Sequence, residues 1–79
     1  MFVVYIISND QGKFYKGHTE NIKKRLLEHN SGKTLTTKTG NNWKLIYTEE
    51  FNTREEAIKR EKYFKTAAGR RYLKQKINL

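Results

Sequence analysis

The sequence predicts an α+β fold, a three-stranded antiparallel sheet flanked by helices. Three observations lead to this prediction: a β-hairpin pattern at the N-terminus, a third strand pattern near the middle of the chain, and helical periodicity on both sides of that strand. The elements follow the order β-β-α-β-α-α, which is typical of a small sheet with helices packed on it. A length of 79 residues predicts a single domain over residues 1–79.

The predicted hairpin opens the chain. Residues 2–7 are rich in β-branched and aromatic side chains, residues 8–12 form a turn cluster, and residues 14–17 form the second strand. Side chains alternate between the two faces of a strand. A matching register therefore places Tyr5 and Tyr15 on the same face of the sheet.

A helix is predicted over residues 20–30, with Thr19 as its N-cap. Spacings of four and three residues place three side chains on one face, Ile22, Leu26 and His29. Arg25 precedes His29 by one turn and borders the same face. The pattern leaves open whether His29 packs at the end of the helix or belongs to a site.

The stretch after this helix predicts a loop and then the third strand. Residues 33–42 are polar and show no apolar period, which predicts a loop. Residues 43–51 resume a strand pattern around an apolar centre, Leu45, Ile46 and Tyr47.

Two helices are predicted to follow the third strand. Thr53 and Glu56 form a capping box, which predicts a helix that runs to about residue 66. Ala68 and Gly69 then predict a break, followed by a short last helix over residues 70–77.

The helix after the capping box carries a carboxylate in its apolar stripe. With Ala57 at zero and a turn of about 100° per residue, Phe64 falls at about −20° and Glu61 at about 40°. A carboxylate directed at a core costs several kcal/mol unless it is paired or bound to a cation. The sequence therefore leaves two alternatives, an ion pair with Lys65 or Arg25, or a metal ion.

The composition predicts a polyanionic partner. Lysine and arginine outnumber aspartate and glutamate by 17 to 8, which gives a net charge of +9. The chain has no cysteine, which excludes thiolate metal sites, and only His18 and His29 could serve a zinc ion. No apolar run approaches the roughly 20 residues of a membrane span, so we expect no membrane partner and a cytoplasmic location.

Cations dominate the end of the chain. No acidic residue follows Glu61, whereas six basic residues do, Lys62, Lys65, Arg70, Arg71, Lys74 and Lys76. Such a segment can neutralise nucleic-acid phosphates, with an affinity that falls steeply with salt. Tyr63 and Tyr72 lie among these cations and either stack on bases or pack in the core.

Five segments, taken in order, resemble one protein family. Val-Val-Tyr at 3–5 stands where this family has Gly-Ile-Tyr, and Tyr-Lys-Gly at 15–17 stands where it has Tyr-Ile-Gly. Residues 24–30 resemble the helix that carries its arginine, residues 45–51 its third strand and residues 56–61 its metal-binding helix. The chain resembles the GIY-YIG nuclease superfamily, in particular small stand-alone members related to the nuclease domain of the bacterial excision-repair nuclease.

The resemblance implies the GIY-YIG nuclease fold, a metal ion and a set of catalytic residues. Glu61 would bind one divalent ion, Mg²⁺ or Mn²⁺, which keeps several waters and a substrate phosphate. Tyr5 would act as the general base or orient the attacking water, with nearby cations favouring its phenolate. Tyr15 would hydrogen-bond the water or the phosphate, and Arg25 would bind the phosphate. His29 would position Tyr5 or relay its proton.

Contacts with nucleic acid are implied as well. Gly17 would let the backbone approach the site closely. Lys65 would support Glu61 or contact DNA, and the cations Arg70 and Arg71 would bind phosphates.

The chain departs from the family pattern at three positions. Val3 replaces the first glycine of the motif, and Lys16 replaces its isoleucine. Tyr63 stands where the excision-repair members have an asparagine, which leaves Glu61 as the one protein ligand of the metal. His18 follows Gly17 in the sequence, and it either touches substrate or is an ordinary surface residue.

The sequence therefore predicts a metal-dependent endonuclease that hydrolyses DNA phosphodiester bonds, and the resemblance suggests DNA repair. One alternative is a catalytically weak or inactive basic nucleic-acid-binding module, and another is a protein-interaction domain whose basicity is incidental. We expect no separate recognition domain, so cleavage would be structure-selective or weakly selective, with a protein partner as a source of targeting. The oligomeric state and the choice between DNA and RNA stay open.

Overall fold

The computed structural model describes residues 1–31 and 42–78. The elements in these ranges are β1 (Phe2–Ser8), β2 (Phe14–Thr19), α1 (Ile22–Asn30), β3 (Lys44–Phe51), α2 (Arg54–Phe64) and α3 (Ala67–Ile77). Their order confirms the predicted fold class. The loop predicted over residues 33–42 lies outside the described residues, apart from Asn42. The helices of the described ranges are not long and apolar enough to cross a membrane.

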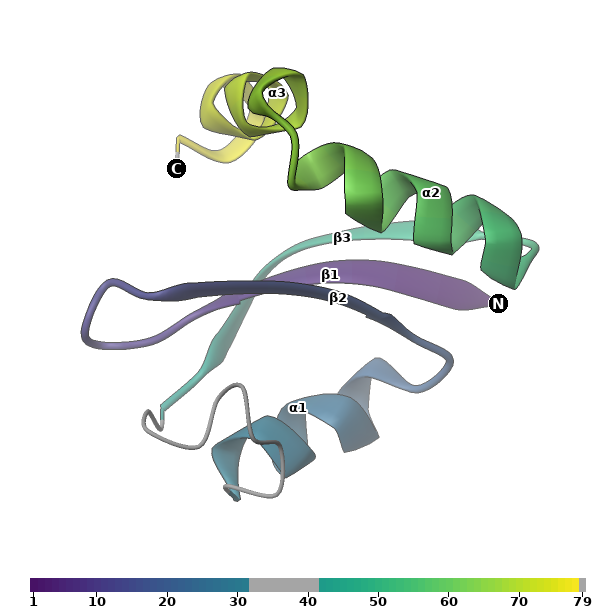
Figure 1. Cartoon of the computed structure of the whole chain (residues 1–79). Helices are drawn as coiled ribbons and strands as arrows, with labels where there is room; N and C mark the ends of the chain where they lie inside the picture. Colours follow the sequence, from purple (N-terminus) through teal and green to yellow (C-terminus); the bar gives the residue numbers. More distant parts are fainter. Residues whose placement is uncertain (32–41, 79) are drawn as a thin grey trace.

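The sheet is antiparallel, with β1 in the centre between β2 and β3. Helix α1 covers one face of the sheet, and α2 and α3 cover the other (Figure 1). Tyr5 pairs with Gly17, and Ile7 pairs with Tyr15. Because cross-strand partners point to the same face, this register confirms that the two tyrosines share one face.

Strand β1 supplies two cores, one for each face. The core under α2 and α3 contains Val4, Ile6, Ala57, Phe64 and Leu73. The core under α1 contains Tyr5, Ile7 and Trp43, with four partly buried side chains around it, Val3, Tyr15, Ile22 and Leu26. Among the fully buried residues of the two cores, the phenol hydroxyl belongs to Tyr5 under α1, which is where a polar site can form.

Helix α1 starts later than predicted, and its N-cap is Asn21 rather than Thr19. The Asn21 side chain accepts a hydrogen bond from the backbone N–H of Lys24 at 3.1 Å. The Thr19 hydroxyl accepts from the backbone N–H of Asn21 at 3.2 Å instead. Threonine therefore shapes the turn before the helix, while asparagine, an equally good cap, closes its first turn.

The predicted break at Ala68 and Gly69 is wrong. Helix α2 ends at Phe64, and the Thr66 hydroxyl caps α3 by accepting from the Gly69 N–H at 3.1 Å. A Cβ atom on Gly69 would clash with the carbonyl oxygen of Tyr63. This glycine therefore allows α3 to start directly against the end of α2.

Candidate active site

The hydroxyl of Tyr5 lies at the centre of a buried polar cluster between β1, β2 and α1. The Tyr5 residue is 1% exposed, and its oxygen lies 2.9 Å from Nε2 of His29. Arg25 donates to the same oxygen through Nε at 3.4 Å. The Tyr15 ring lies 6.1 Å from the Tyr5 ring and 4.8 Å from the His29 ring, measured between centroids. Four of the five predicted catalytic residues therefore meet at one place.

The local structure of the strands and of α1 explains why these four side chains lie together. Strand alternation directs Tyr5 and Tyr15 towards α1, and a spacing of four residues puts Arg25 and His29 on neighbouring turns of that helix. A Cβ atom on Gly17 would lie 2.8 Å from the Tyr5 hydroxyl and 3.0 Å from the Tyr15 ring. The close approach expected at Gly17 is thus present, and it is the tyrosine rings that need it. Its contact with nucleic acid stays a prediction.

The tyrosine and the histidine are both neutral. Burial raises the pKa of Tyr5 to about 12, although the hydrogen bond from Arg25 acts to lower it. Arg25 thus favours the phenolate, as predicted for a nearby cation, but desolvation is the larger effect and keeps the phenol protonated. Burial and the charge of Arg25 lower the pKa of His29. Since Arg25 donates to the phenol oxygen, we assign the phenol proton to the bond with His29 Nε2 and the imidazole proton to Nδ1.

Arg25 links this cluster to solvent. The guanidinium also donates from Nη1 to Oε1 of Glu28 at 3.2 Å, and both side chains are about one-third exposed, at 34% and 32%. The hydrogen bond to Tyr5 is the main cause that raises the pKa of Arg25 above its ordinary value. The group therefore stays charged, with one side fixed by the protein and the other open to a ligand.

Glu61 lies on α2, across the sheet from the tyrosine cluster. Its Oε1 lies 2.6 Å from Nδ1 of His18, and its Oε2 accepts from Nζ of Lys65 at 2.9 Å. Burial acts to raise the pKa of Glu61, but the hydrogen bonds from His18 and Lys65 outweigh it and hold this pKa below its ordinary value. The group is an anion, 18% exposed. Lys65 rather than Arg25 is therefore its partner.

His18 is the functional candidate that the sequence left undecided. Strand alternation places it on the face of β2 opposite Gly17, and its partner in the register is Val4, a core residue under α2 and α3. The same face receives Glu61 from the stripe of α2. Combining the two patterns could have paired His18 with Glu61, but only once α2 is known to pack on β2.

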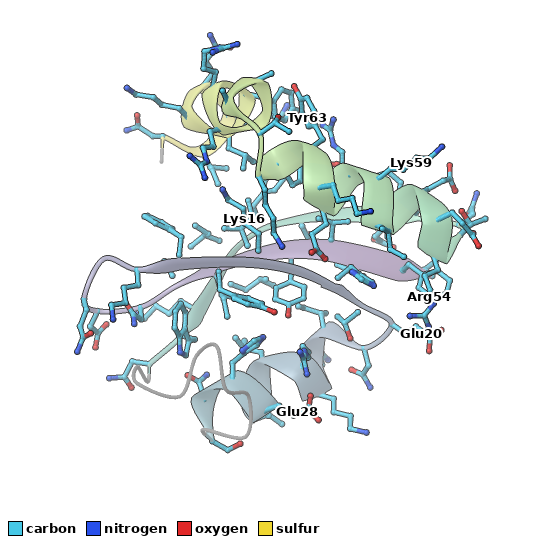
Figure 2. The ribbon with its side chains drawn as sticks, in the orientation of Figure 1. Lys16, Glu20, Glu28, Arg54, Lys59 and Tyr63 are labelled. Carbon is cyan, nitrogen blue, oxygen red and sulfur yellow. The ribbon has the colours of Figure 1, made fainter. Side chains whose placement is uncertain are left out.

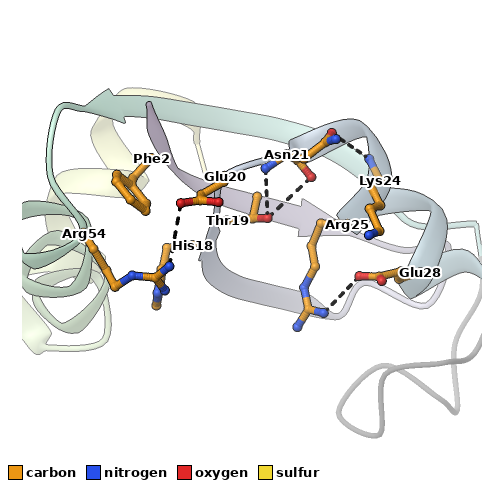
Figure 3. Close-up of a pocket in the computed structure, with 9 residues that line it drawn as sticks. All are labelled: Phe2, His18, Thr19, Glu20, Asn21, Lys24, Arg25, Glu28 and Arg54. Carbon is orange, nitrogen blue, oxygen red and sulfur yellow. Dashed lines mark hydrogen bonds and ion pairs between the residues drawn. The ribbon is translucent and has the colours of Figure 1, made fainter.

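A pocket of about 380 Å³ at the end of β2 brings the two halves together. Arg25 enters it from α1, Arg54 from the start of α2, and His18 from β2 (Figure 3). Arg54 also reaches Glu20 at 3.8 Å. Glu61 acts electrostatically on Tyr5, as a minor cause of its raised pKa. The pocket is thus flanked by guanidinium groups, and two of its lining residues lead to the site: Arg25 contacts the buried phenol, and His18 contacts the carboxylate of Glu61.

The residues fit a divalent ion with one protein ligand. Among the described residues, no group of three or more His, Asp or Glu side chains could hold a metal. Mg²⁺ binds through one or two carboxylates, substrate phosphates and several waters, and Glu61 offers an anionic oxygen donor of this kind. The ion would take the place of Lys65 or His18 on that carboxylate.

The predicted nucleic-acid residues of the C-terminal segment lie on the side of α2 and α3. Lys65 is paired with Glu61, while Arg70 and Arg71 are exposed on α3. The rings of Tyr63 and Tyr72 pack against each other at 6.4 Å between centroids. Of the two alternatives for these tyrosines, the structure shows packing.

Comparison with known proteins identifies the class. Residues 1–78 match the GIY-YIG catalytic domain, and the chain belongs to the GIY-YIG family. This is a family of nucleases, which implies a nucleic-acid substrate, and its members generally depend on a divalent metal. The family prediction is therefore confirmed.

The similar proteins are small relatives called UPF0213. The UPF0213 protein SSP2268 of Staphylococcus saprophyticus is 38% identical over 72 residues, which cover 90% of this chain and 88% of that protein. A UPF0213 protein of Bacillus licheniformis is 41% identical over 76 residues, with 91% and 78% covered. The solution NMR structure of the UPF0213 protein BH0048 from Bacillus halodurans shares 30% identity and a TM-score of 0.55, with 92% and 82% covered. This neighbour confirms the predicted fold.

Proposed function

We propose that this protein is a metal-dependent endonuclease that hydrolyses DNA phosphodiester bonds. The observation that supports the proposal best is the hydrogen-bonded trio of Tyr5, Arg25 and His29 beside a pocket that Arg25 and Arg54 enter from opposite elements. A phosphodiester needs an activated water, positive charge on its non-bridging oxygens and help for the leaving oxygen. The trio and its surroundings offer residues for the first two of these tasks.

Tyr5 and His29 activate the water as a relay. The attacking water gives its proton to the phenol oxygen of Tyr5, and the phenol proton moves to Nε2 of His29. The relay needs no free phenolate before the reaction, in keeping with a Tyr5 pKa of about 12. It does need a neutral histidine, and burial, helped by Arg25, favours that form by lowering the pKa of His29. Tyr15, which packs on both rings, orients the pair.

Arg25 and Glu61 serve the phosphate from two sides. The open side of the Arg25 guanidinium binds the non-bridging oxygens and stabilises the charge that develops there. Glu61 would hold Mg²⁺ or Mn²⁺. The bound ion supplies charge neutralisation and Lewis-acid polarisation of the phosphate. Hydrogen bonds from His18 and Lys65 lower the pKa of Glu61 and so keep its carboxylate ionised and ready to bind a cation.

One observation favours the second candidate, a nucleic-acid-binding module with little or no turnover. Both oxygens of Glu61 are occupied by protein side chains, His18 and Lys65, so the ion must displace a partner. We further propose a single domain in the cytoplasm, a role in DNA repair and a protein partner that supplies targeting.

A nicking assay separates the two candidates. Supercoiled and branched DNA are incubated with Mg²⁺, Mn²⁺ or a chelator and with the variants Glu61→Gln and Arg25→Gln. Exposed residues on the same helices provide matched controls, Glu55→Gln and Lys23→Gln. We expect metal-dependent nicking that falls by about 10²-fold or more in the two site variants and is unchanged in the controls.

Two results would contradict the endonuclease. Equal nicking by the wild type and both site variants would mean that the activity comes from elsewhere. DNA binding without any metal-dependent nicking would favour the binding module.

A further inference from the structure

We propose that the groove between β2 and α3 binds an unpaired nucleic-acid strand and that Phe14 stacks on one of its bases. The groove has a volume of about 340 Å³ and is lined by Phe14, Lys16, Arg70, Arg71 and Lys74. It lies on the face of the sheet opposite the Tyr5 cluster. The inference rests on the proposed nucleic-acid function and specifies which form of substrate the protein selects.

Phe14 is the exposed aromatic side chain of the described residues. It is 50% exposed, whereas the other phenylalanines and the tyrosines of these ranges are buried or half-buried. The residue begins β2, an edge strand, so no further strand covers it. Around it the groove is walled by arginine and lysine side chains, whose aliphatic stems give it apolar walls with charged ends. A base, with an apolar face and a charged backbone, matches this combination.

The cations of the groove are available to phosphates. Arg70, Arg71 and Lys74 are exposed, and within the described ranges none of them forms an ion pair with a carboxylate. By contrast, Arg25, Arg54 and Arg60 each have a carboxylate partner there. Cations without a protein partner are the groups that neutralise nucleic-acid phosphates.

Lys16 connects the groove to the candidate active site. Figure 2 shows its side chain rising from β2 towards α2 and α3, where Nζ donates to the carbonyl oxygen of Phe64 at 3.1 Å. Burial lowers the pKa of Lys16, and the charges of Arg70 in the groove and of Lys65, the partner of Glu61, lower it further. Lys65, Lys16 and Arg70 therefore place positive charge between Glu61 and the groove.

The strand geometry sets the length of this path. His18, Lys16 and Phe14 point to the same face of β2, and at about 3.3 Å per residue Phe14 lies about 13 Å from His18. A strand with a phosphate in the pocket at His18 would reach Phe14 within a few nucleotides. A base in a duplex is covered on both faces by its neighbours, so Phe14 can stack only on a base that is unstacked. The groove therefore favours single strands, flaps and branch points.

The test measures binding without cleavage. Fluorescence anisotropy follows a fluorescein-labelled oligo(dT) and the same strand paired with oligo(dA), both in EDTA at several salt concentrations. We expect the wild type to prefer the single strand. Phe14→Ala should bind it about 10-fold more weakly, with little change for the duplex. Leu45→Ala, an exposed apolar residue on the opposite edge strand and 41% exposed, is the matched control and should bind like the wild type.

The salt dependence tests the cations. Lys74→Gln should lower the slope of log affinity against log salt by about 0.7 for the single strand. Lys59→Gln is its control, because Figure 2 shows Lys59 on the outer side of α2, away from the sheet. Melting curves check that each variant is folded.

The groove proposal is overturned if Phe14→Ala binds the single strand as well as the wild type, or if the wild type does not prefer the single strand. Because binding is measured in EDTA, the result is independent of turnover. A protein that binds through Phe14 but nicks nothing supports the groove and contradicts the endonuclease. A protein that nicks DNA while Phe14→Ala leaves binding unchanged contradicts the groove alone.

Discussion

The two faces of the sheet differ in how they treat polar groups. Under α2 and α3 the buried core residues are apolar, and Arg60, a cation that packs against their rings, is held at the side by Glu49 at 2.8 and 3.2 Å. Its guanidinium lies 4.7 Å from the Phe64 ring. Under α1 a histidine that is 0% exposed meets the Tyr5 hydroxyl. One central strand therefore supports a packing core on one face and a polar cluster on the other.

The two faces therefore contribute differently to stability and to chemistry. In an apolar core, each buried apolar atom adds to the stability of the fold. Two buried polar groups must hydrogen-bond to each other to offset the cost of removing them from water. Tyr5 and His29 do so through each other, which fixes their geometry at some expense of stability. We therefore expect substitutions in the apolar core under α2 and α3 to affect folding and substitutions in the Tyr5 cluster under α1 to affect activity.

The largest effect is expected from Phe64→Ala, which tests the packing face. Phe64 is 0% exposed, so its truncation leaves a cavity and should lower the free energy of unfolding by about 3–5 kcal/mol. Phe14→Ala makes the same chemical change at an exposed site and should cost no more than about 0.5 kcal/mol. Urea unfolding followed by circular dichroism measures both. Equal losses would mean that the α2–α3 face does not carry the stability.

Tyr5→Phe tests the polar face and removes a single oxygen. We expect the nicking rate to fall by about 10²-fold, because the relay loses its central group. Stability should fall by about 1–3 kcal/mol at most, since His29 loses a hydrogen-bond partner. Tyr63→Phe, which deletes a hydroxyl on the opposite face, serves as control and should keep its nicking rate. A Tyr5→Phe protein that nicks normally would show that the cluster is structural.

Local patterns predicted the elements, and tertiary contacts decided the details that the patterns missed. The capping box of Thr53 and Glu56 is present as predicted, because both partners lie within one turn. Gly69 was predicted to break a helix, yet its role is to admit the Tyr63 carbonyl from another helix. A glycine looks the same in sequence whether it ends a helix or permits a close contact.

The candidate site was predictable to a similar degree. Strand alternation placed Tyr5 with Tyr15, helical spacing placed Arg25 with His29, and the family resemblance joined the two pairs in one site. The pairing of Glu61 with His18 joins residues 43 positions apart and depends on how α2 packs on β2, which no local pattern states. The protonation of Tyr5 depends on the balance between burial and the Arg25 charge, and only the structure sets the burial.

Gly17→Ala tests how tightly the polar face is packed. The new Cβ atom would lie 2.8 Å from the Tyr5 hydroxyl and 3.0 Å from the Tyr15 ring, and neither ring can move without disturbing His29. We expect a loss of about 1–3 kcal/mol in unfolding free energy and a further drop in nicking rate. Gly12→Asn, in the turn where φ is +76°, is a control that leaves the cluster untouched. Unchanged stability and activity in Gly17→Ala would show that the rings have room to shift.

The smallest effect expected is a pH dependence of stability that arises on the polar face alone. The folded state lowers the pKa of His29, mainly by burial, so the unfolded chain binds a proton more readily. The stability linked to this group is complete above the unfolded pKa of about 6.5 and is lost as the pH falls from there towards the folded pKa. Glu61, whose pKa is also lowered, acts with the same sign, but only below its ordinary range. Urea unfolding between about pH 7.5 and 5.5 therefore leaves out the contribution of Glu61, and His29→Gln should flatten the decline seen in the wild type. An equal decline in His29→Gln would place the acid sensitivity elsewhere, whereas a flat profile would tie it to the same neutral imidazole that the relay requires.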